Sequence, residues 1–119
     1  MISRDEILKG QPCPPEYEFN LEALLIALNK FRQVWGQSML VTSGYRTPEH
    51  NDLVGGAKNS AHLFCQAADI WDRDRSLAKY CARYESILEK CGLWWEHPLW
   101  TDTWVHLQIR PESSRCFIP

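Results

Sequence analysis

The run Trp104–Arg110 constrains the fold most, because its side chains alternate between apolar and polar. Val105, Leu107 and Ile109 are apolar, and the residues between them are polar. A period of two is typical of a β-strand that buries one face and leaves the other polar. The aromatic run Gly92–Glu96 precedes it, and the stretch between the two runs contains a proline, which breaks a helix. The sequence therefore predicts a β-hairpin made of these two runs.

Helical and strand-like patterns alternate over the rest of the chain. The clearest helical pattern follows Asn20, a residue type that favours helix N-caps, and ends near Gly36. Other patterns predict a strand over 39–45, a loop with a short helix over 46–60, a buried strand over 67–71 and one helix over 77–92. Together with the hairpin, this order predicts an α+β fold with an antiparallel sheet and helices.

The chain has 119 residues, about the length of one domain, so we expect a single domain over residues 1–119. Ser3 and Glu6 have the spacing of a capping box, and a proline cluster follows them. Residues 1–19 are therefore expected to form a short N-terminal clasp.

Charge and hydropathy exclude two classes of partner. The formal net charge is -2, which lacks the positive excess of a nucleic-acid-binding surface. No apolar stretch approaches the roughly 20 residues that a membrane helix requires. We therefore expect no nucleic acid partner and no membrane insertion.

The N-terminus and the cysteines indicate a compartment. Met1–Glu6 contains two acidic residues where a secretory signal would carry positive charge. The five cysteines are odd in number and form no Cys-x-x-Cys pair, so neither a disulfide framework nor a ribbon-type zinc site is predicted. The expectation is a cytoplasmic protein without a signal peptide and with reduced thiols.

Two histidines and one aspartate form the informative constellation. His62 and Asp69 lie in the segment Ser60–Asp69, and His106 lies in the second strand of the predicted hairpin. Catalytic zinc commonly has three protein ligands and an open position for water, and two imidazoles with one carboxylate suit this ion. Such a site predicts hydrolysis of an amide. On spacing alone a second interpretation stays open, in which the histidines are ordinary residues of an α+β domain without metal.

Several ordered motifs accompany these residues. They are Ser43–Pro48 (SGYRTP), Asn51, Gly55–Ser60 (GGAKNS), Ser60-x-His62-x6-Asp69 and Trp104-x-His106. With these motifs, which extend over most of the chain, the sequence resembles the zinc D-alanyl-D-alanine carboxypeptidase family, including its phage-encoded cell-wall peptidases. It resembles more distantly the Hedgehog signalling domain of similar fold.

The resemblance implies a small Hedgehog/DD-peptidase-like α+β domain in which His62, Asp69 and His106 hold Zn²⁺. It also implies that Arg46 and Ser60 lie near the substrate. The implied activity is that of a zinc metallopeptidase that cleaves peptide bonds in bacterial peptidoglycan stem peptides, as a D,D-carboxypeptidase or as an endopeptidase of the phage-lysin kind. A lysin without a signal would reach the cell wall through a membrane pore made by a partner.

The general base is the least determined residue. In dipeptidase relatives a glutamate lies three residues before the last zinc histidine, but Thr103 occupies that position here. In Hedgehog-like relatives the glutamate ends the preceding strand, which indicates Glu96. If Glu96 faces Asp102 or Trp104 across the hairpin, it shares the face of His106. Asp102 is the second choice for the base.

Two further positions bear on the site. Trp104 shares the face of His106 and is expected to line the substrate cleft. Cys65 stands where relatives usually have glycine, and we expect it to be a small buried apolar residue. The alternative to an enzyme is a catalytically silent zinc-binding module with a structural or interaction role, which the Hedgehog resemblance and Thr103 permit.

Overall fold

The computed structural model describes residues 1–119. It contains five α-helices, three short 3-10 helices and five strands. In chain order these are α1 (Arg4–Leu8), η1 (Pro15–Tyr17), α2 (Glu18–Trp35), β1 (Val41–Ser43), α3 (Pro48–Leu53), η2 (Ala61–Phe64), β2 (Ala67–Trp71), α4 (Ser76–Arg83), α5 (Glu85–Cys91), β3 (Trp94–Glu96), η3 (Pro98–Trp100), β4 (Trp104–Gln108) and β5 (Cys116–Phe117). None of the helices combines the length and the hydropathy needed to cross a membrane.

The strands form one sheet in the order β1-β2-β4-β3-β5. All neighbouring strands are antiparallel except β3 and β5, which run parallel. The predicted α+β fold with an antiparallel sheet is therefore confirmed, and β3 and β4 form the expected hairpin. The strand β5 was not predicted, because its two residues are too few to show a period.

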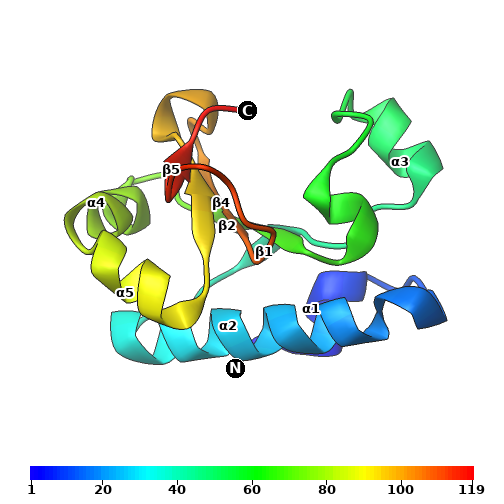
Figure 1. The fold of residues 1–119 in the computed structure, drawn as a ribbon, viewed down its shortest axis with the longest axis horizontal. Coiled ribbons are helices and arrows are strands. Elements are labelled where there is room, and N and C mark those ends of the chain that lie inside the picture. The colour runs from blue at the N-terminus through cyan, green and yellow to red at the C-terminus, as the bar shows by residue number, and fades with distance from the viewer.

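Helices cover one face of the sheet. Figure 1 shows α2 passing beneath the strands with α4 and α5 beside them, whereas α3 lies on the other side. Ile70 and Leu107 of the sheet and Leu24 and Leu28 of α2 are almost completely buried in this core. Burial of one such side chain contributes roughly 1.5–3 kcal/mol. The opposite face of β2 and β4 is left for their polar residues.

The start of α2 differs from the prediction. The helix begins at Glu18 directly after η1, and Asn20 lies inside it rather than at its N-cap. The side-chain amide of Asn20 donates a hydrogen bond to the carbonyl of Phe64 in η2, at 3.0 Å. Asn20, which the sequence pattern assigned to the helix N-cap, therefore makes a tertiary hydrogen bond instead of capping α2.

The predicted single helix over 77–92 is two helices. Tyr84 leaves the helical conformation at φ -124° and ψ 48°, and it separates α4 from α5. Because of this break, α5 turns toward α2 and buries Leu88 and Cys91. Glu85 at the start of α5 accepts a hydrogen bond from the indole of Trp95, at 2.8 Å.

Candidate metal centre

Three separate elements bring His62, Asp69 and His106 together. His62 lies in η2, where the Ser60 hydroxyl accepts a hydrogen bond from the His62 backbone N–H at 3.2 Å. Asp69 and His106 are direct cross-strand partners in β2 and β4. All three side chains are buried, and one potential ligand atom from each lies within 4.8 Å of the others. The structure thus assembles the predicted cluster.

The distances within the cluster fit a small divalent cation. Asp69 Oδ1 lies 3.2 Å from His62 Nε2 and 3.0 Å from His106 Nδ1. Two ligands of a tetrahedral zinc ion, each about 2.0–2.1 Å from the metal, are separated by about 3.3 Å. These two separations are close to that value, and all three potential ligand atoms lie within 4.8 Å of one another.

The tautomer of His62 is fixed by its surroundings. Its Nδ1 lies 2.7 Å from the carbonyl oxygen of Gly44, which can only accept a hydrogen bond, so Nδ1 carries the proton. Burial lowers the pKa of His62, and the neutral ring then has a free lone pair on Nε2. That nitrogen is buried without a hydrogen-bond partner. A cation would satisfy it.

The tautomer of His106 is fixed by Gln108. The amide nitrogen of Gln108 donates to the Arg110 carbonyl at 2.9 Å and to the Glu112 carboxylate at 3.2 Å. Its amide oxygen therefore faces His106 Nε2, at 2.7 Å, and accepts the proton of that nitrogen. The other ring nitrogen, Nδ1, points to Asp69.

The pKa shifts of His106 and Asp69 show which interactions a bound cation would replace. Burial disfavours the charged ring of His106, but its hydrogen bonds to Asp69 and Gln108 outweigh burial and raise its pKa. Burial also opposes ionisation of Asp69, and the hydrogen bond from His106 nevertheless lowers the pKa of that carboxyl group. One proton between His106 and Asp69 still leaves His62 Nε2 unpaired. A divalent cation satisfies all three groups, so the residues present fit the metal that the resemblance implies.

Gln108 is a site residue that the sequence analysis did not identify. We expect Gln108→Leu to weaken zinc affinity roughly 10- to 100-fold, the usual effect of removing an outer hydrogen-bond partner of a ligating histidine. Competition with a chromophoric chelator measures this affinity. Gln66→Leu is the matched control, because the Gln66 side chain bonds to Arg110 rather than to a ligand. Equal zinc affinity in both variants would show that Gln108 does not set the tautomer of His106.

Gly44 links the site to α1. The predicted strand over 39–45 ends already at Ser43, because the following residues turn toward α1 and Tyr45 N–H donates to the Ile7 carbonyl at 2.8 Å. A Cβ atom on Gly44 would overlap the backbone of Ile7. The carbonyl that orients His62 therefore sits where only glycine fits.

Replacement of Gly44 by alanine tests this link. We expect Gly44→Ala to lower the free energy of unfolding by about 1–3 kcal/mol, the usual cost of overpacking. It should also weaken zinc binding, because the Gly44 carbonyl moves away from His62. Urea unfolding measures the free energy of unfolding, and chelator competition measures zinc affinity. If Gly44→Ala changed neither, the close packing of Gly44 on the Ile7 backbone would be contradicted.

Glu96 reaches the site through the register of the hairpin. The register of the pairs Trp94↔Gln108 and Trp95↔Leu107, extended by one residue, puts Glu96 opposite His106 rather than opposite Asp102 or Trp104 as predicted. The register differs because η3 and the residues around it leave the ladder, so β3 ends early. The predicted and observed registers differ by an even number of residues. Glu96 therefore still lies on the same face of the hairpin as His106, as predicted.

The environment of Glu96 suits a proton acceptor. The residue is half-buried, and burial raises the pKa of its carboxyl group. The charge of His106 opposes this rise, and the charge of Asp69 adds to it. Asp102, in contrast, is exposed in the turn before β4. Of the two carboxylates predicted as the base, Glu96 is the one that the fold brings to the cluster.

The predicted substrate-binding residues surround the cluster. Arg46 Nη2 lies 3.4 Å from Asp69 Oδ2, and its Nε donates to the Ser43 hydroxyl at 3.1 Å. Ser60 caps η2 next to His62. Trp104 pairs with Trp71, two residues along the ladder from the Asp69–His106 pair, and it therefore lies on the same face of the sheet as His106. These residues form the rim of the cluster.

Two further residues contact the ligands or lie between them. Phe117 of β5, which the sequence did not indicate, packs its ring against His106 with centroids 6.0 Å apart. Cys65 adopts the left-handed conformation at φ 57° that favours glycine, and it is buried as expected. Burial raises the pKa of the Cys65 thiol to about 12, so it remains protonated.

An α+β domain with a buried His-Asp-His cluster on the polar face of its sheet has the build of a metal-dependent hydrolase. A sequence model of the Peptidase M15 family matches residues 3–108, a span that includes all three cluster residues. The chain belongs to this family of metallopeptidases, which confirms the family predicted from the motifs. None of the curated proteins matches the chain.

Proposed function

We propose that the protein is a zinc-dependent metallopeptidase that hydrolyses peptide bonds in bacterial peptidoglycan stem peptides, as a D,D-carboxypeptidase or as an endopeptidase of the phage-lysin kind. The observation that carries the proposal is the convergence of His62, Asp69 and His106 with one buried nitrogen unpaired, beside the half-buried Glu96. Membership of a peptidase family supports a peptide as the substrate.

His62, Asp69 and His106 would hold the Zn²⁺ ion, which when bound supplies a Lewis acid for the scissile carbonyl and makes water more acidic. The Glu96 carboxylate accepts a proton from the attacking water and delivers it to the nitrogen of the leaving amine. Because Glu96 shares the face of His106, its carboxylate acts on the same side of the sheet as the cluster.

Arg46, Ser60 and Trp104 position the peptide. Protein groups use three of the five N–H groups of Arg46, which leaves two for a carboxylate or carbonyl of the substrate. The Ser60 oxygen accepts a backbone hydrogen bond, so its own hydroxyl proton is free to donate. Trp104 offers an apolar surface on the other side of the cluster.

Digestion of purified muropeptides, with and without a chelator, tests the proposal. We expect cleavage that stops with the chelator and returns with added zinc. Mass spectrometry distinguishes the two activities, because a carboxypeptidase releases only the terminal D-alanine and an endopeptidase converts cross-linked dimers to monomers. Absence of cleavage in zinc-loaded protein, or cleavage that the chelator does not affect, would overturn the proposal.

A catalytically silent zinc-binding module is the second candidate function. The observation that favours it is Thr103, which cannot transfer a proton as the glutamate of dipeptidase relatives does. The backbone carbonyl of Thr103 accepts a hydrogen bond from the backbone N–H of Asp72 at 2.8 Å, and its side chain takes no part in this bond. This candidate predicts bound zinc together with no cleavage of any muropeptide, so the same experiment separates it from the first.

A further inference from the structure

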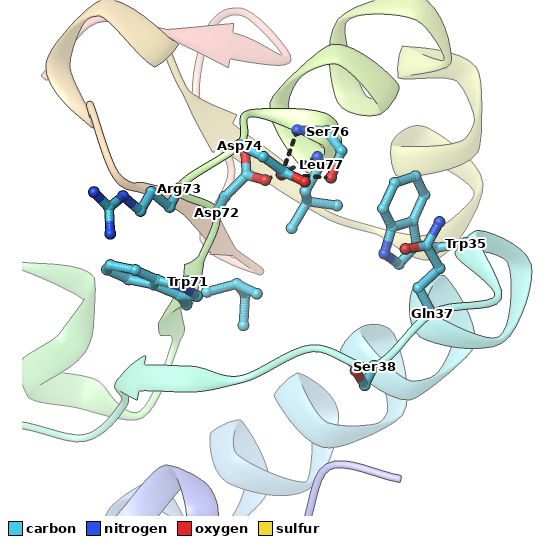
Figure 2. Close-up of a pocket in the computed structure, with 10 residues that line it drawn as sticks. Trp35, Gln37, Ser38, Trp71, Asp72, Arg73, Asp74, Ser76 and Leu77 are labelled. Atoms are coloured by element: carbon cyan, nitrogen blue, oxygen red, sulfur yellow. Dashed lines mark hydrogen bonds between the residues drawn. The ribbon is translucent and has the colours of Figure 1, made fainter.

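The two sides of β2 carry different sets of polar groups. Figure 2 shows Trp71 and Arg73 projecting from the end of β2 on the side away from Trp35, which ends α2. Asp69 lies two residues before Trp71 and therefore on the same face of the strand. A substrate bound at the metal centre is therefore held by side chains from the Asp69 side of the sheet, the side on which α3 lies (Figure 1).

Arg46 is the one arginine or lysine that forms an ion pair with a residue of the cluster. Its Nη2 lies 3.4 Å from Asp69 Oδ2, and its side chain is 16% exposed. It comes from the loop between β1 and α3, so no regular element fixes its direction. The guanidinium is a rigid planar fork, and it matches a ligand only when its plane is held. The contacts that hold this plane therefore decide what Arg46 can bind.

Asn51 of α3 holds one end of the guanidinium. Its Oδ1 accepts a hydrogen bond from Arg46 Nη1 at 3.4 Å. Its Nδ2 donates to the Ala57 carbonyl at 2.9 Å, and a carbonyl can only accept. The orientation of the amide is therefore fixed by Ala57, with Oδ1 toward Arg46.

Gly56 closes the space behind this contact. Its backbone N–H donates to the Asn51 carbonyl at 2.9 Å. A Cβ atom on Gly56 would overlap the Asn51 side-chain amide and lie 3.1 Å from Arg46 Nη1. The loop after α3 thus packs directly on the contact between Asn51 and Arg46.

The three acceptors around Arg46 leave a defined pair of donors. Ser43 accepts from Nε, Asn51 from Nη1 and Asp69 from Nη2, so one N–H remains on each Nη nitrogen. Asn51 itself is 2% exposed and cannot contact a substrate. Any effect of Asn51 on the substrate therefore passes through Arg46.

We propose that Asn51 is a positioning residue for substrate binding. It fixes the guanidinium of Arg46 so that the free N–H groups of the two Nη nitrogens face a carboxylate or carbonyl of the substrate. That this ligand is a peptide rests on the proposed function, whereas the fixation of Arg46 does not.

NMR spectroscopy of the full chain with ¹⁵N-labelled arginine tests the fixation. Rotation about the Cζ–Nη1 bond averages the two Nη1 protons of a free guanidinium, and a hydrogen bond to the protein restricts that rotation. We expect separate Nη1 signals for Arg46 in the wild type and one averaged signal in Asn51→Leu, which lacks the acceptor. The signals that disappear in Arg46→Lys identify Arg46.

Two further variants separate the contact to Arg46 from the contact to Ala57. Asn51→Asp keeps the acceptor for Arg46 and loses only the donor to Ala57, so the Nη1 signals should stay separate. Gly56→Ala keeps Asn51 but displaces its amide, so the signals should average as in Asn51→Leu. An averaged signal in the wild type, or separate signals in both Asn51→Leu and Gly56→Ala, would overturn the proposal.

Cleavage of a stem peptide measures the consequence for binding. We expect Asn51→Leu to raise KM about tenfold, the scale of one lost hydrogen bond to a charged group, with kcat and zinc content unchanged. The matched control is Asn29→Leu on α2, because Asn29 bonds twice to the Ile2 backbone, at 2.7 and 3.0 Å. The control should lose stability and keep its KM.

A double-mutant cycle separates an effect through Arg46 from a general loss of structure. Arg46→Lys removes the planar fork, so Asn51→Leu should raise KM no further in that background. Additive effects on KM, or an equal rise in Asn29→Leu, would overturn the proposal. A wild type that cleaves no stem peptide but shows the expected Nη1 signals would reject the peptidase and keep the fixation of Arg46. Cleavage by a wild type with an averaged Nη1 signal would do the reverse.

Discussion

Replacement of His106 by alanine is expected to remove both the bound zinc and the peptidase activity. The change deletes one of three ligands and leaves Asp69 buried without its closest partner, at 3.0 Å. The loss of zinc affinity should exceed the roughly 10- to 100-fold loss expected when only an outer partner is removed. Elemental analysis after dialysis measures the metal, and muropeptide digestion measures the activity.

The control for this variant is His50→Ala, because His50 is an exposed histidine on α3. It should retain one zinc per chain and full activity. Circular dichroism checks that His106→Ala remains folded. Stoichiometric zinc in a folded His106→Ala variant would mean that the third ligand is a different residue.

Replacement of Glu96 by glutamine is expected to leave zinc bound and to lower turnover by roughly 10²- to 10⁴-fold, the usual contribution of a general base. Glutamine keeps the shape of the side chain but cannot accept the proton of the attacking water. Steady-state cleavage of a stem peptide measures turnover, and elemental analysis confirms the zinc content.

Asp102→Asn is the matched comparison for Glu96→Gln. Asp102 is exposed in the turn before β4, so its substitution should change turnover little. The reverse result, with a strong effect of Asp102→Asn and none of Glu96→Gln, would assign the base to Asp102. Equal turnover in both variants and the wild type would show that neither carboxylate is the general base.

The alternation in Trp104–Arg110 was sufficient to predict β4 and its polar face. This pattern reports burial directly, because only one face of the sheet packs on helices. The start of α2 and the break at Tyr84 were not predictable in this way. They depend on a bond from Asn20 to η2 and on the packing of α5 against α2, which are tertiary contacts that override local preference.

The cluster itself was visible in the sequence only as three residue types in a family motif. The tautomers of its histidines depend on the Gly44 carbonyl, which lies in the SGYRTP motif but was given no role there, and on the Gln108 amide, which no motif marked. The spacing of two between His106 and Gln108 on a predicted strand was the one available signal, since such residues share a face. The position of Glu96 was predicted by face but not by register, because the length of the ladder depends on where η3 leaves it.

Each imidazole of the cluster is held by residues outside the cluster. His62 depends on Gly44, which packs on α1, and His106 depends on Phe117 of β5 and on Gln108, which Glu112 holds. A partly folded chain that lacks either α1 or β5 would present misaligned donor atoms. If the protein binds Zn²⁺ as proposed, uptake of the ion would require α1 and β5 to be in place.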